Sequence, residues 1–513
     1  MKKGQIVTAT VDRVDFPNKG RLLTEDGERL MVKNVVPGQS LSVMVTKKRS
    51  GSAEGRVMEI LEESPLEMDK RAGAPDDICS MAGICGGCLY QTIFYDDQLM
   101  IKDGQVREMF RPVLDGRTSY GECLDDEVVR DDSEESVFDQ VYEGIKASPL
   151  VHAYRNKMEF SFGDEVKDGP LMLGLHKRGS FYDICDVSDC RIISDDIRCA
   201  LVMTRDYFRT LGIPYLKKNH VGYLRHLLVR RSEHSGEILI DLVTSSQREC
   251  LQNGGKSDCE GVLDASNGLL KDLEDNLLLG WKSMLLEALE RVGVPVDKVT
   301  ILHTVNDREA DVVEDQGTDI LHGLGYITEE VLGLKFKITP FSFFQTNPLG
   351  AEVLYSVARD YILDGKDKAG DVVYDLYSGT GTIAQLMSPA AKKVVGVEIV
   401  EEAVVAAREN AGLNGVTNCE FIAGDVLKVL DDIAEKPDYI ILDPPRDGVH
   451  PTALRKIIDY GVDSLIYISC KPTSLARDLP VFMELGYKVT RLSAVDMFPW
   501  TGNVEVIAKI QKV

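Results

Sequence analysis

The cysteine at position 470 stands where a reactive side chain would be most useful. The β-branched and aromatic run 464–469 predicts a buried parallel strand, and Cys470 follows at the point where that strand would leave its sheet. Ligands and reacting groups of open α/β sheets collect at this carboxyl edge. A thiol there could act as a nucleophile, but a buried structural cysteine would look the same until other residues are considered.

A glycine-containing loop follows an earlier predicted strand. Residues 371–377 lead into the sequence SGTGT at 378–382, and Glu398 ends the next strand about 20 positions on. A glycine turn lets a ligand approach the backbone closely, and an acid at that distance suits a pair of ribose hydroxyls. Because the third glycine of a dinucleotide fingerprint is missing, the loop alone also fits a nicotinamide enzyme.

The sequence Asp-Pro-Pro-Arg at 443–446 closes the predicted strand 439–442. The two prolines present the Asp443 carboxylate and the neighbouring carbonyls rigidly at the sheet edge. Methyltransferases that act on nucleobases use such Asp-Pro-Pro turns, and those directed at amino groups usually place an aromatic residue next. Arg446 stands there instead, which favours chemistry at a ring carbon.

Three cysteines crowd one ten-residue window of the sequence PDDICSMAGICGGCLYQ. Cys79, Cys85 and Cys88 lie near a Gly-Gly pair that permits tight turns, so their thiolates could converge on one centre. Cys190 is the best candidate for a fourth ligand, and Cys185 is the next. The spacing differs from the paired C-x2-C of most zinc modules, which leaves an iron–sulfur cluster, zinc or no metal as open readings.

Composition sets the broad class of the protein. The 513 residues allow three or four domains, and without an apolar run of about 18 residues or a signal-peptide core we expect a soluble, cytoplasmic protein. Eleven cysteines, an odd number, fit metal binding or catalysis better than a disulfide framework. The formal charge of −24 argues only weakly against nucleic acid, because binding needs just a local basic face.

The chain divides into three predicted domains. Short alternating runs in residues 1–63 predict a small β-barrel, which could bind RNA or another protein. Residues 64–335 predict a mixed α+β domain, with flexible insertions near 122–145, which is acid-rich, and 252–280, which is rich in Gly, Asp and Asn. A basic phosphate-binding surface could form from Lys177, Arg178, Arg225, His226, Arg230 and Arg231.

Regular alternation of strands and helices begins near residue 336 and continues to residue 513. The predicted strands lie at 371–377, 393–397, 419–422, 439–442, 464–469 and 504–510. Strands that alternate with helices predict a doubly wound, Rossmann-like α/β domain.

Six motifs together closely resemble the RNA uracil-5-methyltransferase family. They are FSFFQTN (341–347), DLYSGTGT (375–382), GVEI (396–399), LDPPRDGVHP (442–451), SCKPTSLARDL (469–479) and FPWTGNVEVI (498–507). The resemblance covers nearly the whole chain apart from the two insertions. It implies that the amino-terminal barrel is a TRAM domain and that Cys79, Cys85, Cys88 and Cys190 hold a 4Fe-4S cluster, as in members acting on 23S rRNA.

The resemblance also implies a role for individual residues. Cys470 matches the nucleophile, and Glu505, which would otherwise be an ordinary carboxylate on the last predicted strand, matches the base. The positions that match S-adenosylmethionine contacts are Gln345, Tyr377, Glu398 and Asp443. Lys471 departs from a common asparagine, and Trp500 and Asn503 stand where histidines are frequent, which puts fine substrate positioning in doubt.

The implied chemistry explains these residue types. C5 of uracil is too weak a nucleophile to take a methyl group, but a thiolate that adds to C6 makes it enolate-like. The thiol must ionise from its ordinary pKa of about 8.5, which positive neighbours such as Lys471 or Arg446 would assist. A carboxylate such as Glu505 then removes the C5 proton, and the base must first be turned out of its stack.

Several functions remain open. The main expectation is methylation of a uridine in 23S rRNA by a monomer that binds no membrane; the alternatives are tRNA uridine methylation, RNA 5-methylcytosine formation and a non-catalytic RNA binder of ribosome assembly. A radical or redox enzyme is disfavoured, because the cysteine loop lacks C-x3-C-x2-C spacing.

Overall fold

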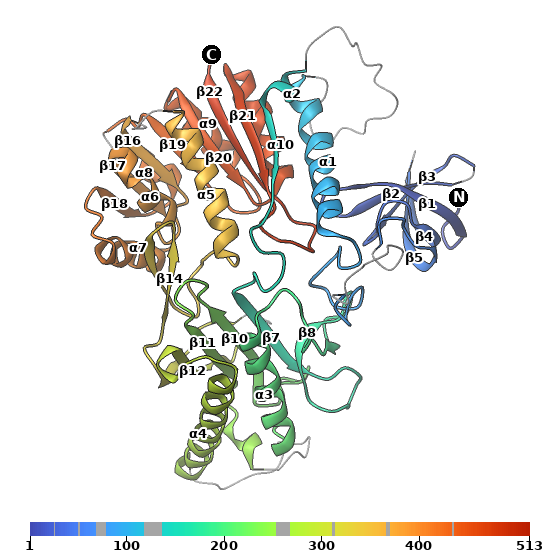
Figure 1. Cartoon of the computed structure of the whole chain (residues 1–513), viewed down its shortest axis with the longest axis vertical. Coiled ribbons are helices and arrows are strands. Elements are labelled where there is room, and N and C mark those ends of the chain that lie inside the picture. The colour runs from blue at the N-terminus through green and yellow to red at the C-terminus, as the bar shows by residue number, and fades with distance from the viewer. Residues whose placement is uncertain are drawn as a thin grey trace. The chain divides into compact units, whose positions relative to one another are not determined.

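The computed structural model describes residues 1–24, 26–49, 52–67, 78–116, 136–252, 267–309, 313–365, 370–432 and 435–513 (Figure 1). The chain forms two compact units. The first unit comprises Met1–Asp76, Leu89–Pro149 and Gly350–Val513, and the second comprises Asp77–Cys88 and Leu150–Leu349. The amino-terminal and carboxy-terminal segments therefore belong to one unit.

The amino-terminal segment folds into a closed barrel with the strand order β1-β2-β3-β5-β4. Its strands are β1 (Ile6–Asp15), β2 (Lys19–Thr24), β3 (Arg29–Lys33), β4 (Ser40–Arg49) and β5 (Ser52–Glu62). Alternate residues of these strands point inward, and the barrel core includes Val11, Leu30 and Val43. The small β-barrel predicted for residues 1–63 is confirmed.

The large sheet of the first unit has the order β18-β17-β16-β19-β20-β22-β21-β6. Its strands are β6 (Tyr142–Lys146), β16 (Gly370–Leu376), β17 (Ala391–Glu398), β18 (Cys419–Ala423), β19 (Tyr439–Leu442), β20 (Ser464–Ser469), β21 (Tyr487–Val495) and β22 (Glu505–Lys512). The pairs from β18 to β20 are parallel, and β22 runs antiparallel to both of its neighbours. The predicted doubly wound α/β fold is confirmed.

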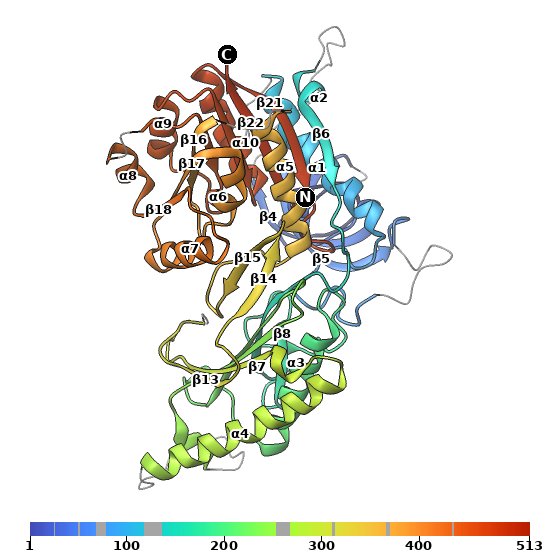
Figure 2. The same cartoon turned by 60° about the vertical axis from the view of Figure 1, so that its left-hand side comes forward.

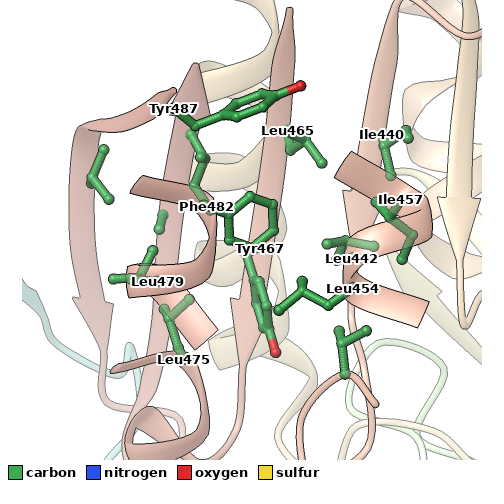
Figure 3. Close-up of a cluster of buried hydrophobic side chains, with 14 of the residues drawn as sticks. Ile440, Leu442, Leu454, Ile457, Leu465, Tyr467, Leu475, Leu479, Phe482 and Tyr487 are labelled. Carbon is green, nitrogen blue, oxygen red and sulfur yellow. The ribbon is translucent and has the colours of Figure 1, made fainter. Parts of the chain in front are cut away.

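Helices cover both faces of this sheet. They are α1 (Tyr95–Leu114), α2 (Val137–Val141), α5 (Pro348–Leu363), α6 (Thr382–Met387), α7 (Glu401–Leu413), α8 (Val426–Asp432), α9 (Pro451–Asp459) and α10 (Pro472–Glu484). On one face, apolar side chains of α9 and α10 pack on those of β19 and β20 around Tyr467 (Figure 3). Leu492 and Ala494 of β21 belong to this core, so Ser493, which accepts a 2.8 Å hydrogen bond from Tyr361 of α5, faces the other side.

The second unit is built on a sheet of order β13-β12-β11-β10-β7-β8-β9. Its elements are β7 (Lys157–Gly163), β8 (Met172–His176), β9 (Ile184–Cys185), α3 (Asp195–Leu211), β10 (Leu224–Arg231), β11 (Ile238–Thr244), α4 (Asn267–Arg291), β12 (Val299–Val305), β13 (Thr318–His322) and the separate hairpin β14 (Ile327–Val331) and β15 (Leu334–Ile338). The helices α3 and α4 lie side by side (Figure 2).

The two predicted insertions are shorter than expected where the structure describes them. Residues 137–146 form α2 and β6, because Phe138 is buried in the sheet core and Glu143 forms a 2.5 Å ion pair with Arg491 of β21. Likewise, much of 252–280 is helix α4, which buries Trp281 against α3 through a 3.0 Å hydrogen bond to Thr204. The remaining parts, 117–135 and 253–266, lie outside the described residues.

The predicted basic surface of the second unit is wrong for its central members. Arg225, His226 and Arg230 are buried in β10. Arg230 donates a 2.9 Å hydrogen bond to the Pro340 carbonyl, and loss of hydration lowers its pKa to about 10. The guanidinium groups of Arg225 and Arg230 donate hydrogen bonds to backbone carbonyls. Their role is therefore structural, and the prediction that they bind phosphate is not supported. No helix among the described residues combines the length and apolar character needed to cross a membrane.

Candidate active site

Three of the predicted functional residues meet at one edge of the large sheet. Cys470 follows the last residue of β20, and Asp443 follows the last residue of the adjacent parallel strand β19. Ser469 pairs with Val506 across the antiparallel ladder, which places Cys470 opposite Glu505, the first residue of β22. The strand register therefore brings together a thiol and two carboxylates that are widely separated in sequence.

Burial raises the pKa of all three groups, and nearby carboxylates raise those of Glu505 and Cys470 further. Burial raises the pKa of Glu505 to about 8, and the Asp443 carboxylate adds to this effect. Burial likewise raises the pKa of Cys470 to about 11, assisted by Glu505 and then Asp443, and raises that of Asp443 to about 7. Without a bound cation, the thiol and the Glu505 carboxyl are therefore predominantly neutral at pH 7.

Arg446 is the positive charge that acts on this site. Its guanidinium lowers the pKa of both Cys470 and Glu505, opposing the larger effect of burial. Lys471, the other cation expected to assist the thiol, extends toward Asp447, with 3.9 Å between Nζ and Oδ1. The structure thus favours Arg446 as the group that promotes ionisation.

Helix α10 holds the Asp-Pro-Pro-Arg loop in place. Ser474 Oγ donates a 2.8 Å hydrogen bond to the Arg446 carbonyl, and the Asp478 carboxylate accepts one from Tyr467 Oη of β20, also at 2.8 Å. Gly448 has φ +78°, and a Cβ there would lie 2.8 Å from Asp478 Oδ2 and 3.1 Å from Ser474 Cβ. The loop can approach α10 this closely only because residue 448 is glycine.

The glycine-containing loop after β16 encloses the other predicted acid. Glu398 accepts hydrogen bonds from the backbone N–H groups of Gly379, at 2.9 Å, and Val400, at 3.0 Å. These bonds fix both carboxylate oxygens at the loop while leaving lone pairs for a ligand hydroxyl. Tyr377 opens the loop with φ 68°, a strained value for a non-glycine residue and one that clusters at functional sites.

The two glycines of this loop serve different purposes. A Cβ on Gly379 would meet no atom within 4 Å, so this residue leaves the open space that a ligand would need. A Cβ on Gly381 would lie 2.6 Å from the Phe421 ring and 2.9 Å from Ala407. The second glycine therefore allows the loop to pack closely against Phe421 and Ala407.

Asp375 is a member of this region that sequence reasoning did not single out. It is fully buried near the end of β16, and burial followed by the charge of Asp443 raises its pKa well above the ordinary value. A carboxylate within the apolar run from Val372 to Leu376, just before a glycine turn, was the available signal.

Three further predicted residues lie in loops outside the strands. Gln345 is half-buried and belongs to the second unit, beyond β15. Trp500 is buried and Asn503 is half-buried in the loop that precedes β22.

The four predicted metal ligands all lie in the second unit. The backbone of Cys85 forms a β-bridge with Lys177, and Arg178 donates a hydrogen bond to the Cys85 carbonyl. Burial raises the pKa of Cys190 to about 12, with smaller contributions from Cys88, Cys79 and Cys85, so the four thiols are near enough to interact electrostatically. Among the described residues, however, no three His, Cys, Asp or Glu side chains are arranged to hold a metal ion, so the structure does not support the predicted cluster.

Comparisons with known proteins agree with the fold and the motifs. Residues 331–513 match the family model of tRNA (uracil-5-)-methyltransferases. A protein of Clostridium tetani, described as an uncharacterized RNA methyltransferase, is 40% identical over 100% of this chain and 99% of its own length. Another so described, from Caldanaerobacter subterraneus, is 40% identical over 100% of both chains.

A solved structure shares the fold over nearly the full length. It is the Pyrococcus abyssi tRNA (uracil-54, C5)-methyltransferase in complex with S-adenosyl-L-homocysteine. The TM-score is 0.66 at 23% identity, and the match covers 98% of this chain and 99% of that one. Near-complete coverage at 40% identity, joined to the match over the sheet that carries Cys470, shows that the chain belongs to the RNA methyltransferases of the uracil-5 family and is an S-adenosylmethionine-dependent enzyme.

Proposed function

We propose that the protein methylates C5 of a specific uridine in RNA through a covalent bond between Cys470 Sγ and C6 of the ring. The observation that carries this proposal is the convergence of Cys470, Asp443 and Glu505 at one sheet edge under the influence of Arg446. A thiol and a carboxylate opposite each other match the two tasks of the reaction, which are addition at C6 and proton removal at C5.

The thiol must lose its proton before it can add to the ring. With a pKa of about 11 in the free protein, Cys470 is seldom ionised at neutral pH. S-adenosylmethionine supplies the methyl group and, as a sulfonium, a positive charge that would lower the pKa of nearby acids. The sites proposed to hold it are Gln345, Tyr377, Glu398 and Asp443.

The covalent steps balance in four stages. The Cys470 thiol gives its proton to solvent, and the thiolate adds to C6 while the electrons of the C5–C6 double bond move into the carbonyl as an enolate. C5 then takes the methyl group, and S-adenosylhomocysteine is released. The Glu505 carboxylate accepts the C5 proton, after which the C5–C6 double bond re-forms and the Cys470 thiolate leaves.

The RNA substrate proposed first is 23S rRNA, on the strength of the cysteine set that resembles members acting on it. The alternative is tRNA, which the description of the matched family model favours. The barrel formed by β1 to β5 is proposed as a TRAM-type RNA-binding module. Mapping of 5-methyluridine in rRNA and tRNA from cells with and without the gene distinguishes the two substrates.

A 4Fe-4S cluster on Cys79, Cys85, Cys88 and Cys190 is part of the same proposal. Its support is the electrostatic proximity of four thiols in one unit, together with the family resemblance. In this role the cluster would tie the cysteine loop to the segment after β9, which carries Cys190. Iron and labile sulfide in anaerobically purified protein test it, and stoichiometric zinc without sulfide would exclude it.

The experiment that tests the reaction compares two variants with labelled RNA on denaturing gels. Cys470→Ala removes the addition step, so neither methylated product nor a covalent RNA adduct should form, while S-adenosylmethionine should still bind. Glu505→Gln retains the thiol but removes the base, so methyl transfer should proceed and RNA should remain attached to Cys470. An adduct with Cys470→Ala refutes the nucleophile; wild-type turnover with Glu505→Gln refutes the base.

A further inference from the structure

The loop between β21 and β22 leads directly to Glu505. In the antiparallel pair of these strands, Val495 at the end of β21 is the cross-strand partner of Glu505 at the start of β22. Asp496 follows Val495 in the chain. Whatever fixes Asp496 therefore also fixes the last rung of the ladder, from which the Glu505 side chain extends.

Lys102 of α1 fixes this point with a wholly buried ion pair. The side chains of Lys102 and Asp496 are both 0% exposed, and 2.7 Å separates Nζ from Oδ1. The same ammonium donates to the Phe498 carbonyl at 3.1 Å, and the Phe498 N–H donates to Asp496 Oδ1 at 3.2 Å. The cation thus binds the loop at two points, one of which is backbone.

A second set of contacts holds the middle of the loop. Trp500 has φ 69° and is buried, an unfavourable backbone conformation for a bulky residue unless its surroundings impose it. The N–H groups of Leu89 and Tyr90 both donate to its carbonyl, at 2.7 and 2.9 Å, and its own N–H donates to Gln98 Oε1 at 2.8 Å. Residues just before α1 and in its first turn therefore form hydrogen bonds with both the N–H and the carbonyl of Trp500.

The turn between β1 and β2 of the barrel closes the other side of the loop. A Cβ at Gly502 would lie 2.4 Å from the Pro17 carbonyl oxygen and 2.8 Å from Leu89 Cδ1. No side chain fits in that space, so the loop is confined between the barrel and the segment before α1. Its freedom to move Glu505 is correspondingly small.

We infer that Lys102 is a positioning residue of the active site, which acts through Asp496 to aim Glu505 at the ring carbon that loses its proton. This inference rests on the proposed role of Glu505 as base. A buried ion pair that only stabilised the fold could be replaced by apolar side chains at little cost, whereas one that sets a geometry could not. The second bond of Lys102, to the Phe498 carbonyl, is the contact that an apolar replacement cannot reproduce.

The test uses the full-length protein with the paired replacement Lys102→Met and Asp496→Leu. Removing both charges avoids the isolated buried charge that either single variant would leave. The matched control is Arg107→Met, which breaks an ion pair of 2.6 Å with Asp103 on the same helix. The measurements are melting temperature, S-adenosylmethionine affinity, and the rate at which a preformed RNA adduct resolves to methylated RNA.

The paired variant should melt within a few degrees of the wild type, bind S-adenosylmethionine normally and form the adduct, but resolve it at least about tenfold more slowly. The control should resolve it at the wild-type rate. Wild-type resolution by the paired variant would overturn the inference, and so would a large drop in melting temperature, because it would assign the pair to stability. If Glu505→Gln also resolves the adduct normally, the proposed function fails and not merely the role of Lys102.

Discussion

Asp496 and Glu505 are two buried carboxylates at the end of the same strand pair, and they differ in how their charge is compensated. Asp496 is fully buried and meets the ammonium of Lys102 at 2.7 Å, so its charge is compensated. Glu505, on the neighbouring strand, is 3% exposed, and the positive group that acts on it is Arg446, which is exposed and only partly offsets burial. The first arrangement suits a group that holds a loop, and the second suits one that exchanges a proton near neutral pH.

This difference shows why burial alone does not identify a functional acid. A carboxylate that is desolvated and held in a close ion pair acts as an anchor, whereas one whose burial is only partly offset by a cation has a raised pKa. Cys470 and Asp443 share the second environment with Glu505. At the reactive edge, burial therefore outweighs the compensating charge of Arg446 for both Cys470 and Glu505.

The largest expected effect is the dependence of the reaction rate on pH, through the ionisation of Glu505. Glu505 must be ionised to accept a proton, and its pKa of about 8 means that the ionised fraction rises about tenfold per pH unit below 8. We expect the rate at which the methylated adduct resolves to increase about 50-fold from pH 6 to pH 8. A profile that is flat over this range, in protein shown by circular dichroism to remain folded, would remove the distinction between the two carboxylates.

Replacing Arg446 should widen the difference between Glu505 and Asp496, because Glu505 would lose the positive charge that partly offsets its burial. In Arg446→Met the pKa of both Cys470 and Glu505 rises, so methylation at pH 7.5 should fall about tenfold and recover partly at pH 9. Lys471→Met is the matched control, because Lys471 extends toward Asp447, and it should change the rate less than twofold. Equal losses in the two variants would contradict the assignment of Arg446.

The stability of the protein should respond to the two carboxylates with opposite signs. The folded-state pKa of Glu505 lies above the value of 4.5 for the unfolded chain, so its contribution is fully present below pH 4.5 and is lost as pH rises toward and through 8. Glu505→Gln cannot ionise and should raise the melting temperature at pH 9 but hardly at pH 5.

By contrast, Asp496→Leu alone leaves the Lys102 ammonium buried without its partner. It should lower the free energy of unfolding by about 3 kcal/mol at neutral pH. Differential scanning calorimetry of both variants at two pH values measures this contrast. A stabilising Asp496→Leu, or a Glu505→Gln whose effect does not vary with pH, would show that the environments have been misassigned.

The smallest effect is expected from the acid-rich residues 117–135, which lie outside the described part of the chain. Asp115 accepts hydrogen bonds from Ser136 Oγ and from the Phe138 N–H, each at 3.1 Å, so the described residues on either side of this stretch are in contact. Its replacement by a short glycine linker should change methylation by less than about twofold.

A deletion extended to residue 146 would remove β6 and the Glu143 to Arg491 ion pair, and it should lower the melting temperature. Comparison of the two deletions thus tests where the dispensable acidic segment ends. A loss of more than about tenfold in turnover from the shorter deletion would show that this segment docks a partner.

Periodicity and turn chemistry in the sequence were sufficient to predict the barrel, the α/β sheet and the strand ends that bear Cys470 and Asp443. The predicted strands 439–442 and 464–469 coincide with β19 and β20, because short β-branched runs bounded by polar residues leave little choice of register. The first part of helix α4, up to residue 280, was assigned to an insertion because the Gly-, Asp- and Asn-rich composition of 252–280 masked its helical pattern.

The environments of these residues were decided only by tertiary structure. Lys102 and Asp496 are 394 residues apart, and local pattern does not show that the first would be buried against the second. The same limit applies to Arg230, which sequence reasoning placed on a surface. Residue types and strand ends follow from local chemistry, but pKa, compensation of charge and the aim of a side chain depend on desolvation by distant segments, which only the packed chain determines.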